Sequence, residues 1–78
     1  MLPFTLQQLR ILKVIATEKN FTKAAEILYV SQPSVSKQIK ILEKNLDIIL
    51  VIRKKNKVYL TDMGKIFFTI FEANFSIV

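Results

Sequence analysis

The sequence predicts a mainly α-helical fold in which three helices are followed by a two-stranded β-hairpin and a fourth helix. Four segments begin with a residue that caps helices and continue with apolar residues three and four positions apart, which is the spacing of one helix face. In the third segment, a proline lies two residues after the capping serine, in the first turn, where a helix tolerates its missing N–H. Between the third and fourth segments, strand-forming residues flank a short basic stretch, which indicates a hairpin.

The first helix is expected at about residues 5–18. Thr5 and Gln8 have the spacing of a capping box, in which each side chain accepts a hydrogen bond from the backbone N–H of the other residue. Five apolar residues then follow one stripe: Leu6, Leu9, Leu12, Ile15 and Ala16. This stripe is the part of the helix that should face the core.

The second helix is expected at about residues 22–29, with Thr22 as its N-cap and Phe21 just outside it. Ala24 and Ala25 have little side-chain bulk, so another helix can approach closely at this point. Only a short turn separates this helix from the next capping residue. Two helices joined in this way predict a helix-turn-helix.

The third helix is expected at about residues 32–45, after the N-cap Ser31. On a helical wheel, its apolar residues gather on one side: Val35, Ile39, Leu42 and Leu46. The opposite side carries Pro33, Lys37, Lys40 and Lys44. Ile41 is an apolar residue near the basic side, and the local sequence does not explain it. One face of this helix therefore belongs to the core and the other is basic.

The hairpin is expected to have strands at residues 48–52 and 58–60. The basic stretch Arg53–Lys57 forms its tip, where Asn56 is the residue that best adopts a left-handed backbone. A basic hairpin after a helix-turn-helix predicts a winged helix-turn-helix, with a three-helix core and a two-stranded β wing. Residues 1–60 are expected to form this domain.

A final helix is expected to begin at Thr61 and Asp62, which act as its cap. Its apolar series consists of Ile66, Phe67, Ile70, Phe71 and Phe75. Left bare, such a series would form an exposed patch, so a second copy of the chain is expected to cover it. We therefore interpret residues 61–78 as the start of a linker or dimerisation helix. The dimer-interface candidates are Phe67, Ile70, Phe71 and Phe75.

Charge favours a polyanionic partner and the residue types present argue against an enzyme. The chain has 78 residues, with 12 Lys and Arg against 6 acidic residues and a net charge of +6. Seven basic and two acidic residues lie between Ser31 and Val58, so this part carries +5 of the total. Such an excess attracts nucleic acid first and an anionic membrane second. The chain contains no Cys or His, so no catalytic residue, metal site, cofactor or small-molecule ligand is expected.

Neither a targeting segment nor a membrane span is expected. The start of the chain lacks the basic region and the apolar core of a signal peptide. The longest apolar stretch, residues 66–78, is interrupted by Glu72 and Asn74 and is too short to cross a bilayer. A location in the cytoplasm, the nucleoid or an organelle stroma is therefore expected.

Several runs of the sequence together resemble a known family. They are Phe21–Leu28, Ser31–Lys40, Leu42–Glu43, Leu50, Arg53, Leu60–Thr61 and Gly64. Over about residues 5–65 they resemble the N-terminal DNA-binding domain of LysR-type transcriptional regulators. The sequence also resembles the plastid and cyanobacterial branch that regulates the Rubisco operon, which would imply the plastid stroma as location. The chain departs from the family pattern at Asp47, where a Gly is usual, and at Val51, where a Phe is frequent.

The resemblance implies sequence-specific binding of double-stranded DNA, with residues 32–45 in the major groove and the wing at 53–57 on the backbone or minor groove. Gln can bond adenine, Lys can reach guanine, and Pro and the Ser methylene can touch a thymine methyl. Other lysines supply charges for phosphates. The candidate DNA-binding residues are Gln32, Pro33, Ser34, Ser36, Lys37, Lys40, Arg53, Lys54, Lys55 and Lys57. For Ser31 and Thr22, helix capping is at least as good an interpretation.

The partner expected on this basis is an interrupted inverted repeat in duplex DNA, bound by a homodimer that pairs through the last helix. In the family, the chain continues into a large effector domain, which this sequence does not include. Two alternatives remain open. The chain could be a basic amphipathic module at a membrane surface, or a truncated interaction module that pairs with full-length regulators.

Overall fold

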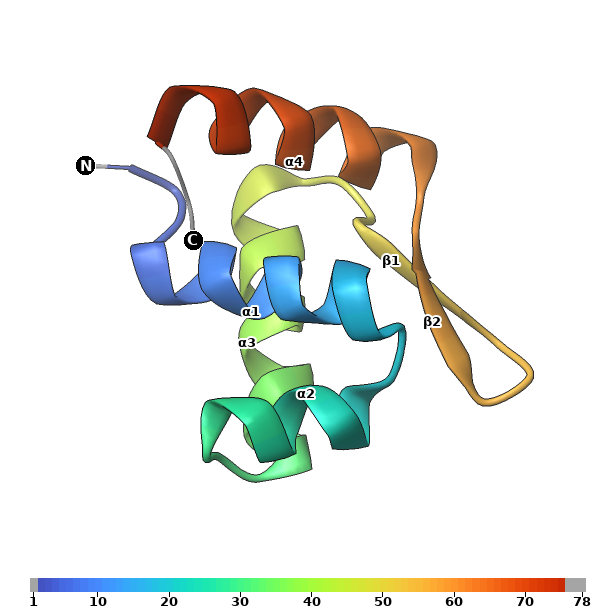
Figure 1. Ribbon diagram of the computed structural model, residues 1–78. Coiled ribbons are helices and arrows are strands. Elements are labelled where there is room, and N and C mark those ends of the chain that lie inside the picture. Colours follow the sequence, from blue (N-terminus) through green and yellow to red (C-terminus); the bar gives the residue numbers. More distant parts are fainter. Residues whose placement is uncertain (1, 76–78) are drawn as a thin grey trace.

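The computed structural model describes residues 2–75, with side chains as far as Ala73. Within that range the chain forms four helices and one two-stranded antiparallel sheet (Figure 1). In chain order these elements are α1 (Leu6–Glu18), α2 (Phe21–Leu28), α3 (Gln32–Leu46), β1 (Val51–Lys54), β2 (Lys57–Leu60) and α4 (Asp62–Phe75). The predicted fold class, a winged helix-turn-helix with a further C-terminal helix, is confirmed.

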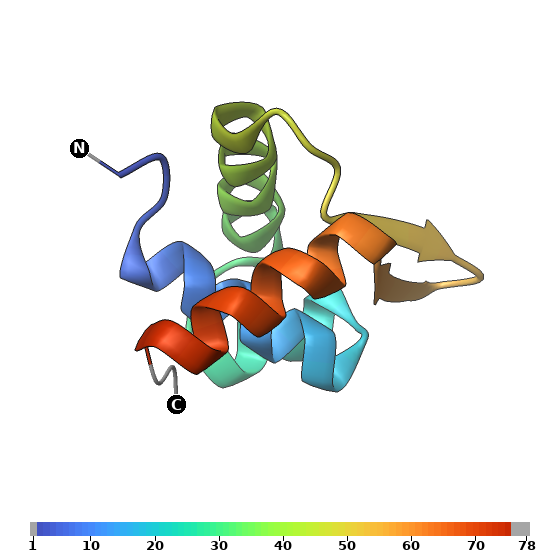
Figure 2. The ribbon, with the colours of Figure 1, turned by 90° about the horizontal axis from the view of Figure 1, so that it is seen from above.

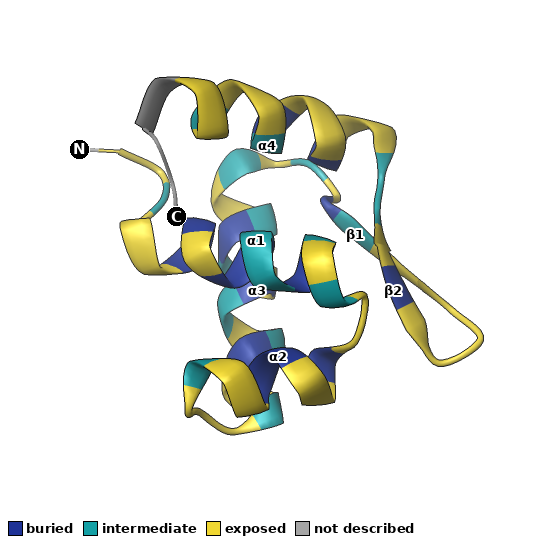
Figure 3. Ribbon diagram, viewed as in Figure 1, coloured by how far each residue is buried: buried dark blue, intermediate teal, exposed yellow. Residues whose placement is uncertain are grey.

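The first three helices pack around one core, and α3 runs behind α1 and α2 in Figure 1. The side chains that are fully buried in this core include Leu12, Ile15, Ala24, Val35 and Ile39. Figure 3 shows these helices buried where they face one another and exposed on the outside. The predicted core face of α3 is thus confirmed, and its basic side is left at the surface.

The capping box at the start of α1 forms as predicted. The Thr5 hydroxyl oxygen accepts a hydrogen bond from the Gln8 N–H at 3.1 Å, and Gln8 Oε1 accepts one from the Thr5 N–H at 2.9 Å. Gln8 is buried, and its amide nitrogen also donates to Gln38 Oε1 at 3.2 Å. One residue therefore begins α1 and ties it to α3.

The predicted start of α2 is wrong by one residue, and Thr22 is not its N-cap. Asn20 takes that role, because its backbone is extended and its side-chain oxygen accepts a hydrogen bond from the Lys23 N–H at 2.9 Å. Phe21 consequently lies inside the helix as its first residue and is buried. The cap shift turns an expected flanking residue into part of the core.

Three helices end at residues with a left-handed backbone: Lys19, Tyr29 and Asp47. None of them is a glycine, the residue that adopts this conformation at least cost. Asp47 occupies the position where the resembled family has Gly, and its φ of 57° confirms that the position requires a left-handed residue. Asp47 thus adopts the backbone conformation expected of a glycine, although aspartate adopts it at a higher energetic cost.

The hairpin begins later in the chain than predicted and its turn is tighter. The expected strands at 48–52 and 58–60 are shifted, because Lys55 and Asn56 form a two-residue turn with φ values of 49° and 66°. Positive φ at both central residues is the requirement of the hairpin turn that matches strand twist. Pairing then runs from Val51 opposite Leu60 to Lys54 opposite Lys57. Arg53, Lys54 and Lys57 are therefore strand residues and not part of the tip.

Helix α4 crosses over α1 when the molecule is seen from above (Figure 2). Phe67 is buried and Phe71 half-buried, and both rings contact the ring of Phe4 with centroids 6.2 and 4.4 Å apart. The expectation that these two rings form a bare patch is wrong, since the segment before α1 covers them. Exposed apolar residues of α4 are instead Met63, Ile66 and Ile70. The side chain of Phe75, also predicted at a dimer interface, lies outside the described residues.

Candidate nucleic-acid interface

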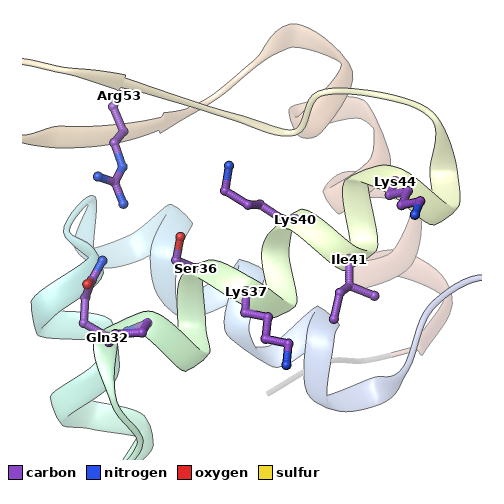
Figure 4. A pocket seen from close by; sticks show the side chains of 8 residues that line it. Gln32, Ser36, Lys37, Lys40, Ile41, Lys44 and Arg53 are labelled. Atoms are coloured by element: carbon purple, nitrogen blue, oxygen red, sulfur yellow. The ribbon is translucent and has the colours of Figure 1, made fainter.

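An open groove follows the exposed face of α3 from its first turn to its last (Figure 4). Seven residues of α3 and one residue of the hairpin line it: Gln32, Pro33, Ser36, Lys37, Lys40, Ile41, Lys44 and Arg53. We call this surface the α3 groove. Six of the ten residues predicted to bind DNA lie here together.

The α3 groove is the outward side of a helix whose inward side is firmly fixed. Val35, Ile39 and Leu42 are buried in the core, so the residues on the far side of the helix point to solvent. Ser31 begins the helix, since its hydroxyl oxygen accepts a hydrogen bond from the Ser34 N–H at 3.2 Å. One end of the groove lies at the N-terminus of α3, and the first turn of this helix contains no acidic residue.

Arg53 completes the groove from the wing. Its partner across the hairpin is Val58, which is buried and whose N–H donates to the Lys19 carbonyl oxygen at 3.0 Å. This hydrogen bond joins β2 to the loop before α2. In Figure 4 the Arg53 side chain extends from the wing toward the end of α3 that carries Gln32. The wing and α3 thus present their polar groups to the same space.

A second hollow lies between the wing and the start of α2. It is lined by Asn20, Phe21, Thr22, Gln32, Arg53, Lys55, Asn56, Lys57 and Val58. We call it the wing hollow. Gln32 and Arg53 line both the wing hollow and the α3 groove, so the two form one continuous surface. Predicted residues Lys55 and Lys57 join the site through this hollow.

Two predicted residues lie apart from this surface. Lys54 is next to Arg53 in the strand and so points to the other side of the hairpin, where it borders a hollow with Ile52 and Tyr59. Ser34 borders a different hollow beside α1 and accepts a hydrogen bond from the Ser31 hydroxyl at 2.8 Å. The structure does not bring either residue to the α3 groove or to the wing hollow.

Sequence reasoning missed several residues that line the site. Lys44 is not among the predicted DNA-binding residues, and the local sequence does not explain Ile41, although both line the α3 groove. The position of Ile41 away from the apolar stripe was the signal that could have identified it. Phe21 gave no such signal, because its place beside the wing depends on tertiary packing. Thr22, for which helix capping was at least as good an interpretation as DNA contact, also lines the wing hollow.

The cations of the site are not neutralised by neighbouring carboxylates. Across residues 2–75, no acidic side chain forms an ion pair with Lys37, Lys40, Lys44 or Arg53. The surface therefore offers positive charges together with an amide, a hydroxyl and two apolar side chains. This combination suits phosphates and the edges of bases. In the same part of the chain, no helix has the length and apolar character needed to cross a membrane.

A family model described as bacterial regulatory helix-turn-helix protein, lysR family, matches residues 6–65. The chain is 79% identical over 67 residues to a probable RuBisCO transcriptional regulator of Phaeodactylum tricornutum (strain CCAP 1055/1), a match that covers 86% of this chain and 22% of the relative. It is 70% identical over 66 residues to a protein of the same name from Trieres chinensis, a match that covers 85% of this chain and 21% of that relative. The chain thus spans about a fifth of the length of these relatives.

Solved structures show the same fold. A complex of the CbnR DNA-binding domain with DNA superposes with a TM-score of 0.87 at 29% identity, covering 94% of this chain and 84% of that one. A complex of the BenM DNA-binding domain with benA site 1 DNA superposes with a TM-score of 0.86 at 36% identity, covering 94% of this chain and 82% of that one.

Proposed function

The chain belongs to the lysR family of bacterial regulatory helix-turn-helix proteins, and from this membership we propose that it binds double-stranded DNA sequence-specifically as the reading module of a transcription regulator. The observation that carries the proposal is the continuous surface formed by the α3 groove and the wing hollow. Its likeness to domains solved in complexes with DNA supports the same function. We propose no enzymatic activity for this chain.

We propose that α3 enters the major groove, which admits an α-helix. Gln32, Ser36 and Lys37 lie on its exposed face near the N-terminus and are assigned to base edges. Lys40 and Lys44 follow along the same groove and are assigned to phosphates. Ile41 and Pro33 supply apolar contacts of the kind that recognise a thymine methyl.

The wing is assigned to the sugar-phosphate backbone and the adjoining minor groove. Arg53, Lys55 and Lys57 border the wing hollow, and each carries a charge that a phosphate would satisfy. Because Val58 ties the hairpin to Lys19, these charges keep a fixed position relative to α3. Lys54, on the other side of the hairpin, has no place in this assignment.

We further propose that two copies bind an interrupted inverted repeat, with half-sites about one helical turn or a multiple apart. The exposed apolar residues of α4 provide the surface for pairing, with Met63, Ile66 and Ile70 in place of the buried Phe67. Relatives named RuBisCO transcriptional regulators support the plastid stroma as the location and the Rubisco genes as targets.

A binding-site selection from random duplex DNA tests the proposal directly. The expected result is enrichment of a two-fold symmetric site that contains A·T pairs, bound at least 10³-fold more tightly than random duplex, in line with roughly 10³–10⁷ for specific binding. Selection without enrichment, or equal affinity for selected and random duplexes, would contradict it. Heterodimers with full-length regulators and little intrinsic DNA affinity would instead identify the chain as an interaction module.

A matched pair of charge reversals assigns the binding to the α3 groove. Lys40→Glu places a negative charge in the groove, whereas Lys65→Glu makes the same change at an exposed position of α4. Only the first variant is expected to abolish binding of the selected duplex in an anisotropy titration. Co-sedimentation with anionic liposomes in parallel separates this function from that of a membrane-surface module, which would bind vesicles and ignore the duplex sequence.

A further inference from the structure

The guanidinium of Arg53 lies over the ring of Phe21, with its central carbon 4.4 Å from the ring centroid. Arg53 belongs to β1 and Phe21 begins α2, so this cation–π contact joins the wing to the helix-turn-helix. Phe21 is 8% exposed and borders the wing hollow. Its ring is therefore held by the core on one side and offers a face to the arginine on the other.

Among the side chains described, those of residues 2–73, the Phe21 ring is the only one that the Arg53 guanidinium contacts through a cation–π interaction, a hydrogen bond or an ion pair. A guanidinium is planar, and it can stack through its face while its five N–H donors lie around its edge. The contact with Phe21 thus leaves the donors of Arg53 available to a ligand.

The neighbouring contacts hold the hairpin backbone in the same place. The Val58 N–H, directly across from Arg53, donates to the Lys19 carbonyl oxygen at 3.0 Å. On the other side of the pleat, Lys19 Nζ lies 5.8 Å from the centroid of the Tyr59 ring. Residues 19–21 therefore contact the wing at its backbone and on both of its faces.

We infer that Phe21 is a positioning residue for DNA binding: its ring holds the Arg53 guanidinium at the junction of the α3 groove and the wing hollow before DNA arrives. The inference rests on the proposed function. An arginine that is already oriented loses less side-chain freedom when it binds, so more of its interaction with the duplex appears as affinity. Removal of the ring should therefore weaken the contribution of Arg53, although Phe21 itself does not touch the DNA.

Phe21→Leu removes the aromatic face and keeps an apolar side chain, whereas Phe21→Tyr keeps the ring. Phe67→Leu is the matched control, because Phe67 is also 8% exposed but lies in α4 against Phe4. For the duplex obtained by selection, Phe21→Leu is expected to lower affinity about fivefold, the scale of a partly desolvated cation–π contact. Phe21→Tyr and Phe67→Leu are expected to stay within about twofold of the unaltered protein, as substitutions outside the contact do.

A double-mutant cycle with Arg53→Ala separates positioning from general destabilisation. In the Arg53→Ala background, Phe21→Leu is expected to cause no further loss of affinity, because the group that the ring positions is gone. Equal losses in both backgrounds, or an equal loss in Phe67→Leu, would overturn the inference. Arg53→Lys supplies a second route that leaves the core intact, and it should reproduce the loss seen for Phe21→Leu.

A measurement without DNA distinguishes failure of this inference from failure of the proposed function. In NMR spectra of the free protein, the ring current of Phe21 should shift the Arg53 side-chain protons, and the shift should vanish in Phe21→Leu but persist in Phe67→Leu. Its absence from the unaltered protein overturns the inference even if that protein binds its selected duplex. If the shift is present and no duplex is bound sequence-specifically, the proposed function has failed, and the positioning role fails with it.

Discussion

The Glu43 carboxylate accepts a hydrogen bond from the Leu50 N–H at 2.8 Å and thereby fixes the path of the chain between α3 and the wing. The same oxygen accepts a second hydrogen bond from the Val51 N–H at 3.2 Å. Leu50 is fully buried, so its N–H has little access to water. One side chain of α3 therefore sets where the wing begins.

Glu43→Ala is expected to lower the free energy of unfolding by about 1–3 kcal/mol, because it leaves two partly buried N–H groups without an acceptor. Urea unfolding followed by circular dichroism measures the change. Glu26→Ala, at an exposed position of α2, provides the comparison and should alter stability by about 0.5 kcal/mol or less. Similar values for the two variants would show that the Glu43 hydrogen bonds contribute nothing specific.

Gly64→Ala is expected to destabilise the fold by about 1–3 kcal/mol through overpacking. A Cβ atom at position 64 would overlap the Leu50 carbonyl oxygen, which is backbone and cannot rotate away. Thermal unfolding provides the measurement, with Thr69→Ala on the exposed side of α4 as control. An unchanged melting temperature in Gly64→Ala would mean that α4 can shift away from Leu50 without loss of packing.

Asp47→Gly is expected to stabilise the protein by about 0.5–1 kcal/mol, since glycine adopts the left-handed backbone at this position without steric cost. A glycine placed two residues earlier by Asn45→Gly lies inside α3 and should destabilise by about 0.3 kcal/mol, the difference in helix propensity between Asn and Gly. In urea unfolding, the free energy of unfolding is expected to rise in Asp47→Gly and to fall in Asn45→Gly. If both variants lose stability, the Asp47 side chain contributes more than its backbone strain costs.

Lys37→Ala is expected to relax the preference at one base position at a cost of about 1–3 kcal/mol, because Lys37 faces the base edges in the proposed complex. Lys55→Ala should weaken all duplexes alike and reduce the slope of affinity against salt concentration by about one, as a phosphate contact does. Titrations of selected and random duplexes at several salt concentrations compare the two variants. Identical behaviour would refute the division between a reading helix and a positioning wing.

Ile66→Glu is expected to convert the proposed dimer to a monomer, because it places a charge in the apolar surface of α4. Sedimentation velocity at micromolar concentration measures the change, and Lys65→Glu at the neighbouring position tests for a general charge effect. Should the unaltered chain itself sediment as a monomer, pairing through α4 has to be abandoned, while the assignment of the α3 groove to DNA remains.

Local signals in the sequence were sufficient where a feature depends on residues close in the chain. The capping box of Thr5 and Gln8 and the cap at Ser31 appear as predicted, because each involves atoms three residues apart. The core face of α3 follows from helical spacing alone. The start of α2 was misplaced because Asn20 and Thr22 are both good caps, and only the three-dimensional path of the loop selects between them.

Features that depend on distant residues could not be predicted in this way. Phe67 and Phe71 turn inward because Phe4 covers them, a contact across more than sixty residues. The stack of Arg53 on Phe21 likewise needs the wing to fold back on α2. Lys54 was grouped with its neighbours by charge, whereas the hairpin register sends it to the opposite side.

The hydrogen bond from the Val58 N–H to the Lys19 carbonyl oxygen limits how far the wing can move relative to the helices. In the proposed complex, a hairpin tied to the helical body moves less freely relative to α3, so a duplex that contacts both α3 and the wing is expected to bend or narrow to fit them. The elastic energy of that distortion depends on base-pair steps that no side chain touches, and flexible pyrimidine–purine steps lower it. Replacing a flexible step by a stiff one at a base pair that the protein does not contact is therefore expected to lower affinity.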